Sequence, residues 1–139
     1  MAHVGACSTD EDCLDGGANG RCVITGAPAR LNCTYDDCFT DHDCADGGVC
    51  GCRDDERYGI NACLPANCRI DSDCGACGYC SPTSGGCFPY VGIVGYFCHT
   101  KDDECVNDSD CAARVPGTSC TFDPTKSSRW TCSPLDCTG

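Results

Sequence analysis

The sequence has few of the residues that build a hydrophobic core. Leu, Ile, Val and Phe together account for 19 of its 139 residues, and no apolar run is long enough to span a membrane. A chain with so little apolar side-chain volume and a net charge of −12 would by composition alone be expected to stay unfolded. Something other than a large hydrophobic core must therefore hold it together.

Basic residues are scarce as well. Nine Lys and Arg residues stand against 21 Asp and Glu residues, which argues against nucleic acid and against anionic membrane surfaces as partners. The segment from Met1 to Val4 has neither the basic start nor the apolar stretch of a secretory signal peptide. We expect residues 1–6 to be leader or added residues in front of a mature chain.

Cysteine is what the chain has in abundance. Twenty of the 139 residues are Cys, a level that is typical of a disulfide scaffold. The count is even, no two Cys residues are adjacent, and Lys, which would balance an anionic thiolate cluster, is rare. These features favour disulfide bonds over metal–thiolate clusters, and so a secreted or cell-surface protein. Asn32 and Asn107 begin sequences that are glycosylated in hosts that make that modification.

One seven-residue pattern, Cys-x-x-Asp-x-Asp-Cys, occurs four times, at intervals of about 30 residues. Such recurrence indicates tandem copies of one structural unit. The third copy diverges through an apolar arm at residues 88–97, and the last carries a closing Cys137. We expect a small disulfide-rich fold, an elongated tandem array of four short knots with short hairpins and little regular secondary structure. The four repeats span residues 7–37, 38–67, 68–104 and 105–139.

Each repeat continues from its heptad through a turn to a further Cys, a variable arm and another Cys. Turn residues and β-formers within the arms predict short hairpins in the first and last repeats. The predicted strand pairs are 23–25 with 30–32, and 118–122 with 129–132.

The position of Cys137 bears on the disulfide pairing. This residue lies where a fifth repeat would begin, and it would be left unpaired if the first Cys of every repeat bonded within its own repeat. We therefore favour bonds that cross the junctions, together with bonds between the second and last Cys of a repeat, although twenty cysteines allow very many connectivities. The favoured bridges are Cys13–Cys33, Cys44–Cys63, Cys111–Cys132, Cys22–Cys38 and Cys120–Cys137.

Each heptad carries two Asp residues, two positions apart. Carboxylates at this spacing can cap turns by accepting backbone N–H bonds, or can both ligate Ca²⁺, as at the start of an EF-hand loop. The further ligands of that loop are missing, so capping is the favoured interpretation. Ca²⁺ is the alternative, and no other cofactor is expected. The eight residues are Asp10, Asp12, Asp41, Asp43, Asp71, Asp73, Asp108 and Asp110.

The apolar arm of the third repeat is open to two interpretations. Aromatic side chains on a rigid base can bind a protein partner at low entropic cost. They can equally form a local core or pack between repeats, because so little apolar volume lies elsewhere. The candidate partner-binding residues are Phe88, Tyr90, Ile93, Tyr96 and Phe97.

Two further features suggest alternative functions. Arg114 and Val115 lie in a segment between expected bridges, where a rigid loop that displays Arg could occupy a trypsin-like protease. Cys77 and Cys80 have the Cys-x-x-Cys spacing of a thiol–disulfide oxidoreductase, but the βαβ context of that family is missing. Arg30 and Leu31 lie in a similar segment of the first repeat. Exposed Arg is ordinary on protein surfaces, so both functions stay alternatives to a role in binding or structure.

The heptad resembles a Cys-x-x-Asp-x-Asp-Cys element of several extracellular families: Dickkopf and colipase-like domains, whey-acidic-protein inhibitors, nematode EB modules, and cysteine-rich repeats of bacterial surfaces. The resemblance covers seven residues in each repeat, and the Cys-Cys pair that follows in Dickkopf and whey-acidic domains is absent. It implies a secreted role in which the Asp residues belong to the scaffold. We expect a non-enzymatic repeat protein with a protein-interaction or surface-structural role, including self-assembly between chains.

Overall fold

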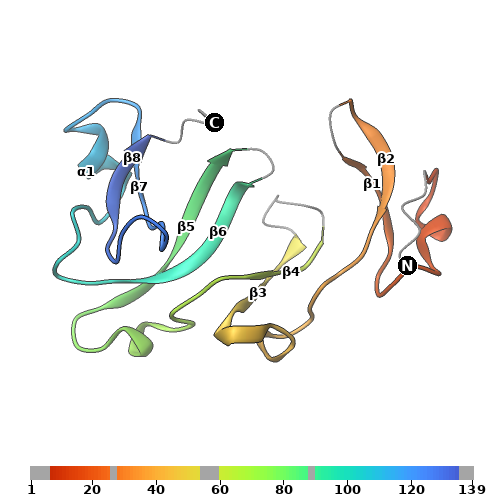
Figure 1. Cartoon of the computed structure of the whole chain (residues 1–139), viewed down its shortest axis with the longest axis horizontal. Coiled ribbons are helices and arrows are strands. Elements are labelled where there is room, and N and C mark those ends of the chain that lie inside the picture. The colour runs from red at the N-terminus through yellow and green to blue at the C-terminus, as the bar shows by residue number, and fades with distance from the viewer. Residues whose placement is uncertain (1–6, 26–27, 54–59, 88–89, 135–139) are drawn as a thin grey trace.

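Four two-stranded antiparallel sheets, one after each heptad, supply the β-structure of the computed structural model (Figure 1). The structure describes residues 7–25, 28–53, 60–87 and 90–134. The expected disulfide-rich fold, with short hairpins and little regular secondary structure, is confirmed. The sheets pair β1 (Arg21–Thr25) with β2 (Arg30–Thr34), β3 (Val49–Gly51) with β4 (Ala62–Leu64), β5 (Tyr79–Cys87) with β6 (Tyr90–His99), and β7 (Thr118–Thr121) with β8 (Thr131–Pro134). We call the four repeats units 1 to 4.

Each heptad forms a single helical turn. The residue before the turn has an extended backbone in every unit, and the second Cys of the heptad lies at or just after the end of the turn, except in α1, which continues to Ala112. A heptad bounded by bridges has no room for a longer helix. The turns are η1 (Asp10–Cys13), η2 (Asp41–Asp43), η5 (Asp71–Cys74) and α1 (Asp108–Ala112), and unit 2 adds η3 (Ala45–Gly47).

Both predicted hairpins form: the unit 1 strands include the predicted residues, whereas the second strand of unit 4 is Thr131–Pro134 and not 129–132. Val23 lies opposite Asn32 in unit 1, and Thr121 lies opposite Thr131 in unit 4. In every hairpin, a Cys of the first strand lies directly opposite a Cys of the second. These opposed pairs are Cys22 and Cys33, Cys50 and Cys63, Cys80 and Cys98, and Cys120 and Cys132.

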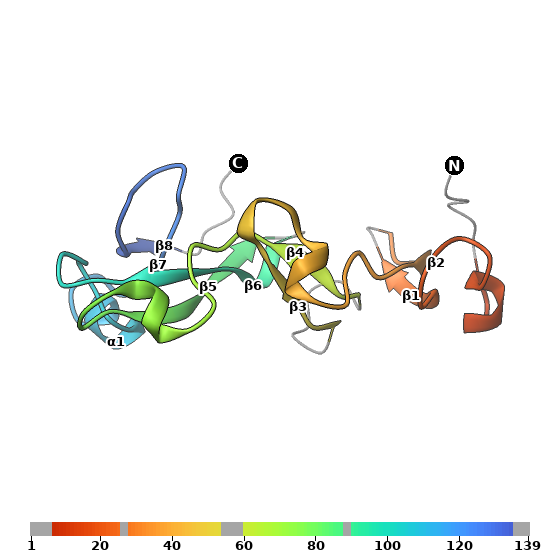
Figure 2. The ribbon, with the colours of Figure 1, turned by 90° about the horizontal axis from the view of Figure 1, so that it is seen from below.

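The molecule is elongated, with its units arranged along the longest axis (Figures 1 and 2). The hairpin β1–β2 lies at one end, β3–β4 lies in the middle, and β5–β6 follows. Unit 4 does not follow as a further step along this axis. Its hairpin β7–β8 lies beside β5–β6 at the far end. Among the described residues, no helix combines the length and apolar character that crossing a bilayer requires.

The main hydrophobic cluster is formed where units 3 and 4 meet. Phe97 of β6 stacks on Phe122, with ring centroids 4.3 Å apart, and Trp130 packs at an angle against Phe122. The Cys105–Cys120 and Cys111–Cys132 bridges complete the cluster. The apolar arm of unit 3 therefore contributes to a core between units, and this core positions the two hairpins.

Candidate functional site

The eight disulfide bonds among the described residues follow one rule in all four units. The first Cys of the heptad bonds to the Cys of the first strand, and the second Cys of the heptad bonds to the Cys of the second strand. The first kind comprises Cys7–Cys22, Cys38–Cys50, Cys68–Cys80 and Cys105–Cys120. The second kind comprises Cys13–Cys33, Cys44–Cys63, Cys74–Cys98 and Cys111–Cys132.

The structure therefore contains the three predicted bonds between the second and last Cys of a unit, and it corrects the junction-crossing bonds. The predictions of Cys22–Cys38 and Cys120–Cys137 are wrong, because Cys22 bonds to Cys7, Cys38 to Cys50, and Cys120 to Cys105. The physical reason is the hairpin, which places its two Cys residues side by side against the two Cys residues of the turn. Cys137 lies outside the described residues.

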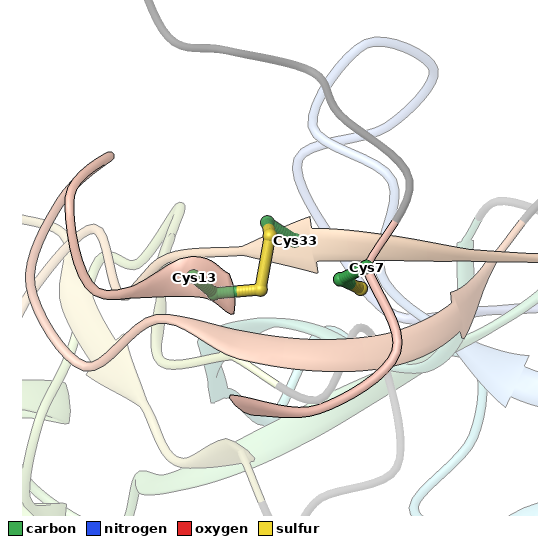
Figure 3. A group of neighbouring side chains, drawn as sticks. All are labelled: Cys7, Cys13 and Cys33. Atoms are coloured by element: carbon green, nitrogen blue, oxygen red, sulfur yellow. A yellow bond between two sulfur atoms is a disulfide. The ribbon is translucent and has the colours of Figure 1, made fainter. Parts of the chain in front are cut away.

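The two bridges of a unit lie against each other. In unit 1, the Sγ atoms of Cys7, Cys13 and Cys33 all lie within 4.8 Å of one another (Figure 3). The corresponding three sulfur atoms are grouped in the same way in units 2, 3 and 4. A reduced unit would offer three thiolates at a spacing suited to a metal ion. In the oxidised structure these sulfurs form bridges instead, and they are the covalent centre of each unit.

The second Asp of each heptad caps the start of the turn. Asp12 Oδ2 accepts hydrogen bonds from the backbone N–H groups of Ser8 and Thr9, at 2.7 and 3.2 Å. Asp43, Asp73 and Asp110 make the same pair of bonds in their own units. These backbone bonds favour the ionised carboxylate, so they hold the pKa of Asp12, Asp43 and Asp73 below the usual range.

The first Asp of each heptad ties the turn to the hairpin. Asp10 Oδ1 accepts the backbone N–H of Cys22 at 2.8 Å. Asp41, Asp71 and Asp108 accept the N–H of the equivalent Cys at 2.9, 3.0 and 2.8 Å. All eight Asp residues thus have a role in the scaffold, as the capping interpretation predicts. In each Asp, these bonds use only one of the two carboxylate oxygens. Ca²⁺ binding by the Asp pairs stays a prediction.

Glycine allows the hairpin to approach the turn. A Cβ on Gly20, two positions before Cys22, would lie 1.9 Å from the carbonyl oxygen of Cys13. A Cβ on Gly78, two positions before Cys80, would lie 2.3 Å from the carbonyl oxygen of Cys74. A side chain at either position would force the hairpin away from the heptad and strain the two bridges between them.

The chain enters units 2, 3 and 4 through one recurring backbone bond. The residue before the first Cys donates its N–H to the carbonyl of the residue two positions before the last Cys. The three bonds run from Asp37 to Asn61 at 2.9 Å, from Asn67 to Tyr96 at 3.0 Å, and from Glu104 to Trp130 at 3.0 Å. The linkers therefore run alongside the second strand of each hairpin, which limits the freedom between units.

Two of these junctions each contain a buried carboxylate. Asp36 forms an ion pair with Arg53 and accepts the backbone N–H of Asn61 at 2.8 Å. Burial raises the pKa of Asp36, but the bonds from Asn61, Asn19 and Arg53 outweigh burial and hold it below the usual range. Asp103 occupies the equivalent position before unit 4. Because both side chains are almost fully buried, we assign them to the structure of the junctions.

The junction of units 3 and 4 also contains a buried histidine, which the sequence analysis did not single out. His99 is 4% exposed, and its Nδ1 lies 2.9 Å from Asp103 Oδ2. Its ring stacks between those of Tyr79 and Trp130, with centroids 4.7 and 4.0 Å away. Trp130 donates its indole N–H to the carbonyl of Cys98 at 3.1 Å. This cluster locks the end of β6 to β8.

The capped turns of units 2, 3 and 4 each present one large apolar side chain to solvent. Phe39, Ile70 and Val106 follow the first Cys of their heptads by one or two positions and are 57%, 62% and 59% exposed. Unit 1 has the polar Ser8 and Thr9 at these positions. These side chains are not part of the hydrophobic core, which lies between units 3 and 4.

The predicted partner-binding arm is only partly available for contacts. Phe97 is 5% exposed and belongs to the core, so its assignment to partner binding is wrong. Ile93 and Tyr96 are half-buried in β6. Phe88 lies outside the described residues, and the side chain of Tyr90 lies outside the described side chains. The aromatic volume of this arm that the structure describes serves packing between units 3 and 4.

The residues that suggested the two alternative functions belong to units 4 and 3 respectively. Arg114 and Val115 follow α1, where both backbone N–H groups donate to the carbonyl of Cys111. Arg114 forms an exposed ion pair with Glu104 at 3.5 Å. Cys80 bonds to Cys68 while Cys77 is a free, exposed thiol, so the predicted Cys77–Cys80 redox pair is not formed.

Comparison of the chain with models of protein families, with curated proteins and with solved structures finds no match. The repeat itself and the surface that it presents are therefore the features that bear on function.

Proposed function

We propose that the chain is a secreted, non-enzymatic module that binds other proteins or further copies of itself. The observation that carries the proposal is the exposed apolar side chain on the capped turn of three successive units, namely Phe39, Ile70 and Val106. Soluble proteins expose single apolar residues without consequence. Recurrence on the same capped turn, one or two positions after the first Cys, is different, because it places similar contacts along an elongated molecule.

The scaffold suits these side chains to binding. The turn that carries Phe39 is fixed by the Cys38–Cys50 and Cys44–Cys63 bridges and by the cap from Asp43. A contact presented on a rigid turn loses little conformational entropy when it binds. Several such contacts on one chain add through effective concentration, so a partner with repeated sites would bind much more tightly than a single turn could achieve.

The bridges also support the proposed location. Eight disulfide bonds among the described residues are typical of proteins from oxidising compartments. The resemblance of the heptad to elements of extracellular families is in line with a secreted protein. The acidic surface would favour basic protein partners over nucleic acid.

A pair of triple variants tests the proposal. Phe39→Ser, Ile70→Ser and Val106→Ser together remove the exposed apolar side chains. His42→Ala, Ser72→Ala and Ser109→Ala together change the position between the two Asp residues of the same heptads and serve as the control. Sedimentation velocity measures self-association, and quantitative capture of extracellular proteins on the immobilised, oxidised chain measures binding to partners.

We expect the apolar triple variant to lose the association or capture seen with the unchanged chain, and the control to retain it. Equal behaviour of the unchanged chain and both triple variants in both measurements would contradict the proposal. The disulfide map of each variant should be compared first, so that a folding defect is not mistaken for a lost contact.

A further inference from the structure

A cavity of about 380 Å³ lies at the junction of units 3 and 4. Unit 3 contributes Ser81, Pro82, Ser84 and His99 to its walls, and unit 4 contributes residues of the heptad turn, β7 and Trp130. Figure 1 shows the two hairpins that flank this junction, β5–β6 and β7–β8, side by side. A cavity between two elements can close unless both elements are fixed, so the contacts that hold the hairpins apart decide whether it is a binding site.

Three contacts fix the two hairpins relative to each other. The hydroxyl group of Thr83 accepts the backbone N–H of Phe122 at 2.9 Å. The indole of Trp130 donates to the carbonyl of Cys98. Asp103, which bonds to His99 at the end of β6, accepts the backbone N–H of Trp130 at 3.3 Å. Buried bonds of this kind keep the walls in place in the absence of a ligand. The cavity is therefore pre-formed, as small-molecule sites usually are.

The walls carry many groups that can form hydrogen bonds. Ser81, Ser84 and Ser119 supply hydroxyl groups, each of which can donate and accept. Asn107 is held by backbone bonds to its Oδ1, and Asp108 likewise by a bond to its Oδ1. These bonds leave the amide N–H donors of Asn107 and the second carboxylate oxygen of Asp108 for a ligand.

Charge and apolar surface narrow the class of ligand. No Lys or Arg is among the described residues that line the cavity, and the chain has a net charge of −12, so an anion would be repelled. Pro82, Val106 and Trp130 add apolar surface to the walls. A neutral molecule with both hydroxyl groups and C–H faces matches this mixture. The volume lies near the lower end of the range for ligand sites, roughly 300–1,000 Å³, so the ligand is small.

We propose that the cavity between units 3 and 4 binds a short, neutral saccharide or the end of a neutral glycan chain. Hydroxyl groups of the sugar would exchange hydrogen bonds with Ser81, Ser84 and Ser119, and its C–H face would lie against the apolar wall. This site shares Val106 with the protein contacts proposed above but takes a different class of ligand, and it would let the module recognise a glycosylated surface.

The single Trp of the chain provides the readout. Trp130 is the only Trp and borders the cavity, so its fluorescence should change when a ligand binds. The oxidised protein is titrated with glucose, N-acetylglucosamine and lactose as neutral probes, with glucosamine as a cationic probe, and with glucuronic acid as an anionic probe. Calorimetry with the same probes provides a second, independent measurement.

A matched pair of variants tests the location. Ser119 borders the cavity, whereas Ser133 lies directly opposite it in the β7–β8 ladder and does not border the cavity. Ser119→Ala should weaken saccharide binding about fivefold or more, because a hydrogen bond is lost. Ser133→Ala should leave the affinity unchanged. Unchanged thermal melting of both variants would exclude a folding defect.

The proposal is supported by a saturable fluorescence change with at least one neutral probe, reduced in Ser119→Ala and retained in Ser133→Ala. It is overturned if no neutral probe binds at high millimolar concentration, or if only glucosamine or only glucuronic acid binds. Equal weakening in both variants would also overturn it, because the binding site would then lie elsewhere.

Discussion

The hydroxyl group of Thr83 forms hydrogen bonds to both backbone groups of Phe122, accepting the N–H at 2.9 Å and donating to the carbonyl at 3.4 Å. Thr83 is 1% exposed. The pair connects β5 of unit 3 to the end of β7 in unit 4, across 39 positions of the sequence. A single buried side chain thus satisfies a backbone peptide of the neighbouring unit.

Replacement of Thr83 should loosen this junction. Thr83→Val keeps the shape but leaves the Phe122 N–H and carbonyl buried without their partner, which should cost about 1–3 kcal/mol of unfolding free energy. Thr83→Ser retains the hydroxyl group and should cost about 1 kcal/mol or less through the lost methyl group. Chemical denaturation followed by Trp130 fluorescence measures both variants. Equal losses would show that the hydroxyl group contributes nothing to the junction.

The capping carboxylates predict how stability depends on pH. Backbone bonds lower the pKa of Asp12, Asp43 and Asp73 in the folded chain, so the unfolded chain binds more protons as pH falls and acid favours unfolding. Their contribution is fully present above the unfolded pKa of about 3.9 and is lost as pH falls through the lower folded value.

Melting temperature measured from pH 7 to pH 2 should therefore be nearly constant at the neutral end and fall below about pH 4. The Asp43→Asn variant removes one of these titrating groups, so its melting temperature should fall less steeply in acid than that of the unchanged chain. A melting temperature that stayed constant down to pH 2 would mean that the caps do not stabilise the oxidised fold.

Asp103 is predicted to stabilise the junction more than its exposed neighbour. Its carboxylate accepts bonds from Thr100 N–H at 2.8 Å and Trp130 N–H at 3.3 Å, in addition to its contact with His99. Asp103→Asn should lower the unfolding free energy by about 1–3 kcal/mol. Asp102→Asn, at an exposed ion pair with Lys101, should change it by about 0.5 kcal/mol or less. Similar losses in the two variants would contradict the assigned role.

Removal of divalent cations distinguishes caps from a Ca²⁺ site. Because each heptad Asp already accepts backbone N–H groups, we expect EDTA to leave the melting temperature of the oxidised protein unchanged. A bound ion would raise the melting temperature by an amount that grows with the ratio of free Ca²⁺ concentration to its dissociation constant, since a ligand of the folded state stabilises that state. A rise on addition of Ca²⁺, reversed by EDTA, would therefore assign the Asp pairs a second role.

The parts of the fold that depend on neighbouring residues could be predicted from the sequence. The Asp caps follow from side chains that reach backbone groups three or four positions away, and the β1–β2 hairpin follows from its β-forming arms. The bond between the second Cys and the last Cys of a unit, as in Cys44–Cys63, follows from the regular spacing of the repeats. In each case the interacting groups are set by the repeat alone.

The remainder depended on three-dimensional arrangement. The predicted pairing of the first Cys residues is wrong because it rests on the position of Cys137, whereas the opposed Cys22 and Cys33 of the hairpin decide the pairing. The core contact of Phe97 with Phe122 and the buried His99–Asp103 pair depend on unit 4 folding back beside unit 3. The one sequence signal for the buried carboxylates at the junctions is the recurrence of Asp two positions before the first Cys, at Asp36 and Asp103.

Mass spectrometry of proteolytic fragments from the non-reduced protein tests the central claim most directly. The account predicts linked fragments that join each heptad only to the hairpin of its own unit, such as Cys38 to Cys50 and Cys44 to Cys63. Fragments that join Cys22 to Cys38, or a mass showing free or metal-bound thiols throughout, would contradict the picture of four separately bridged units.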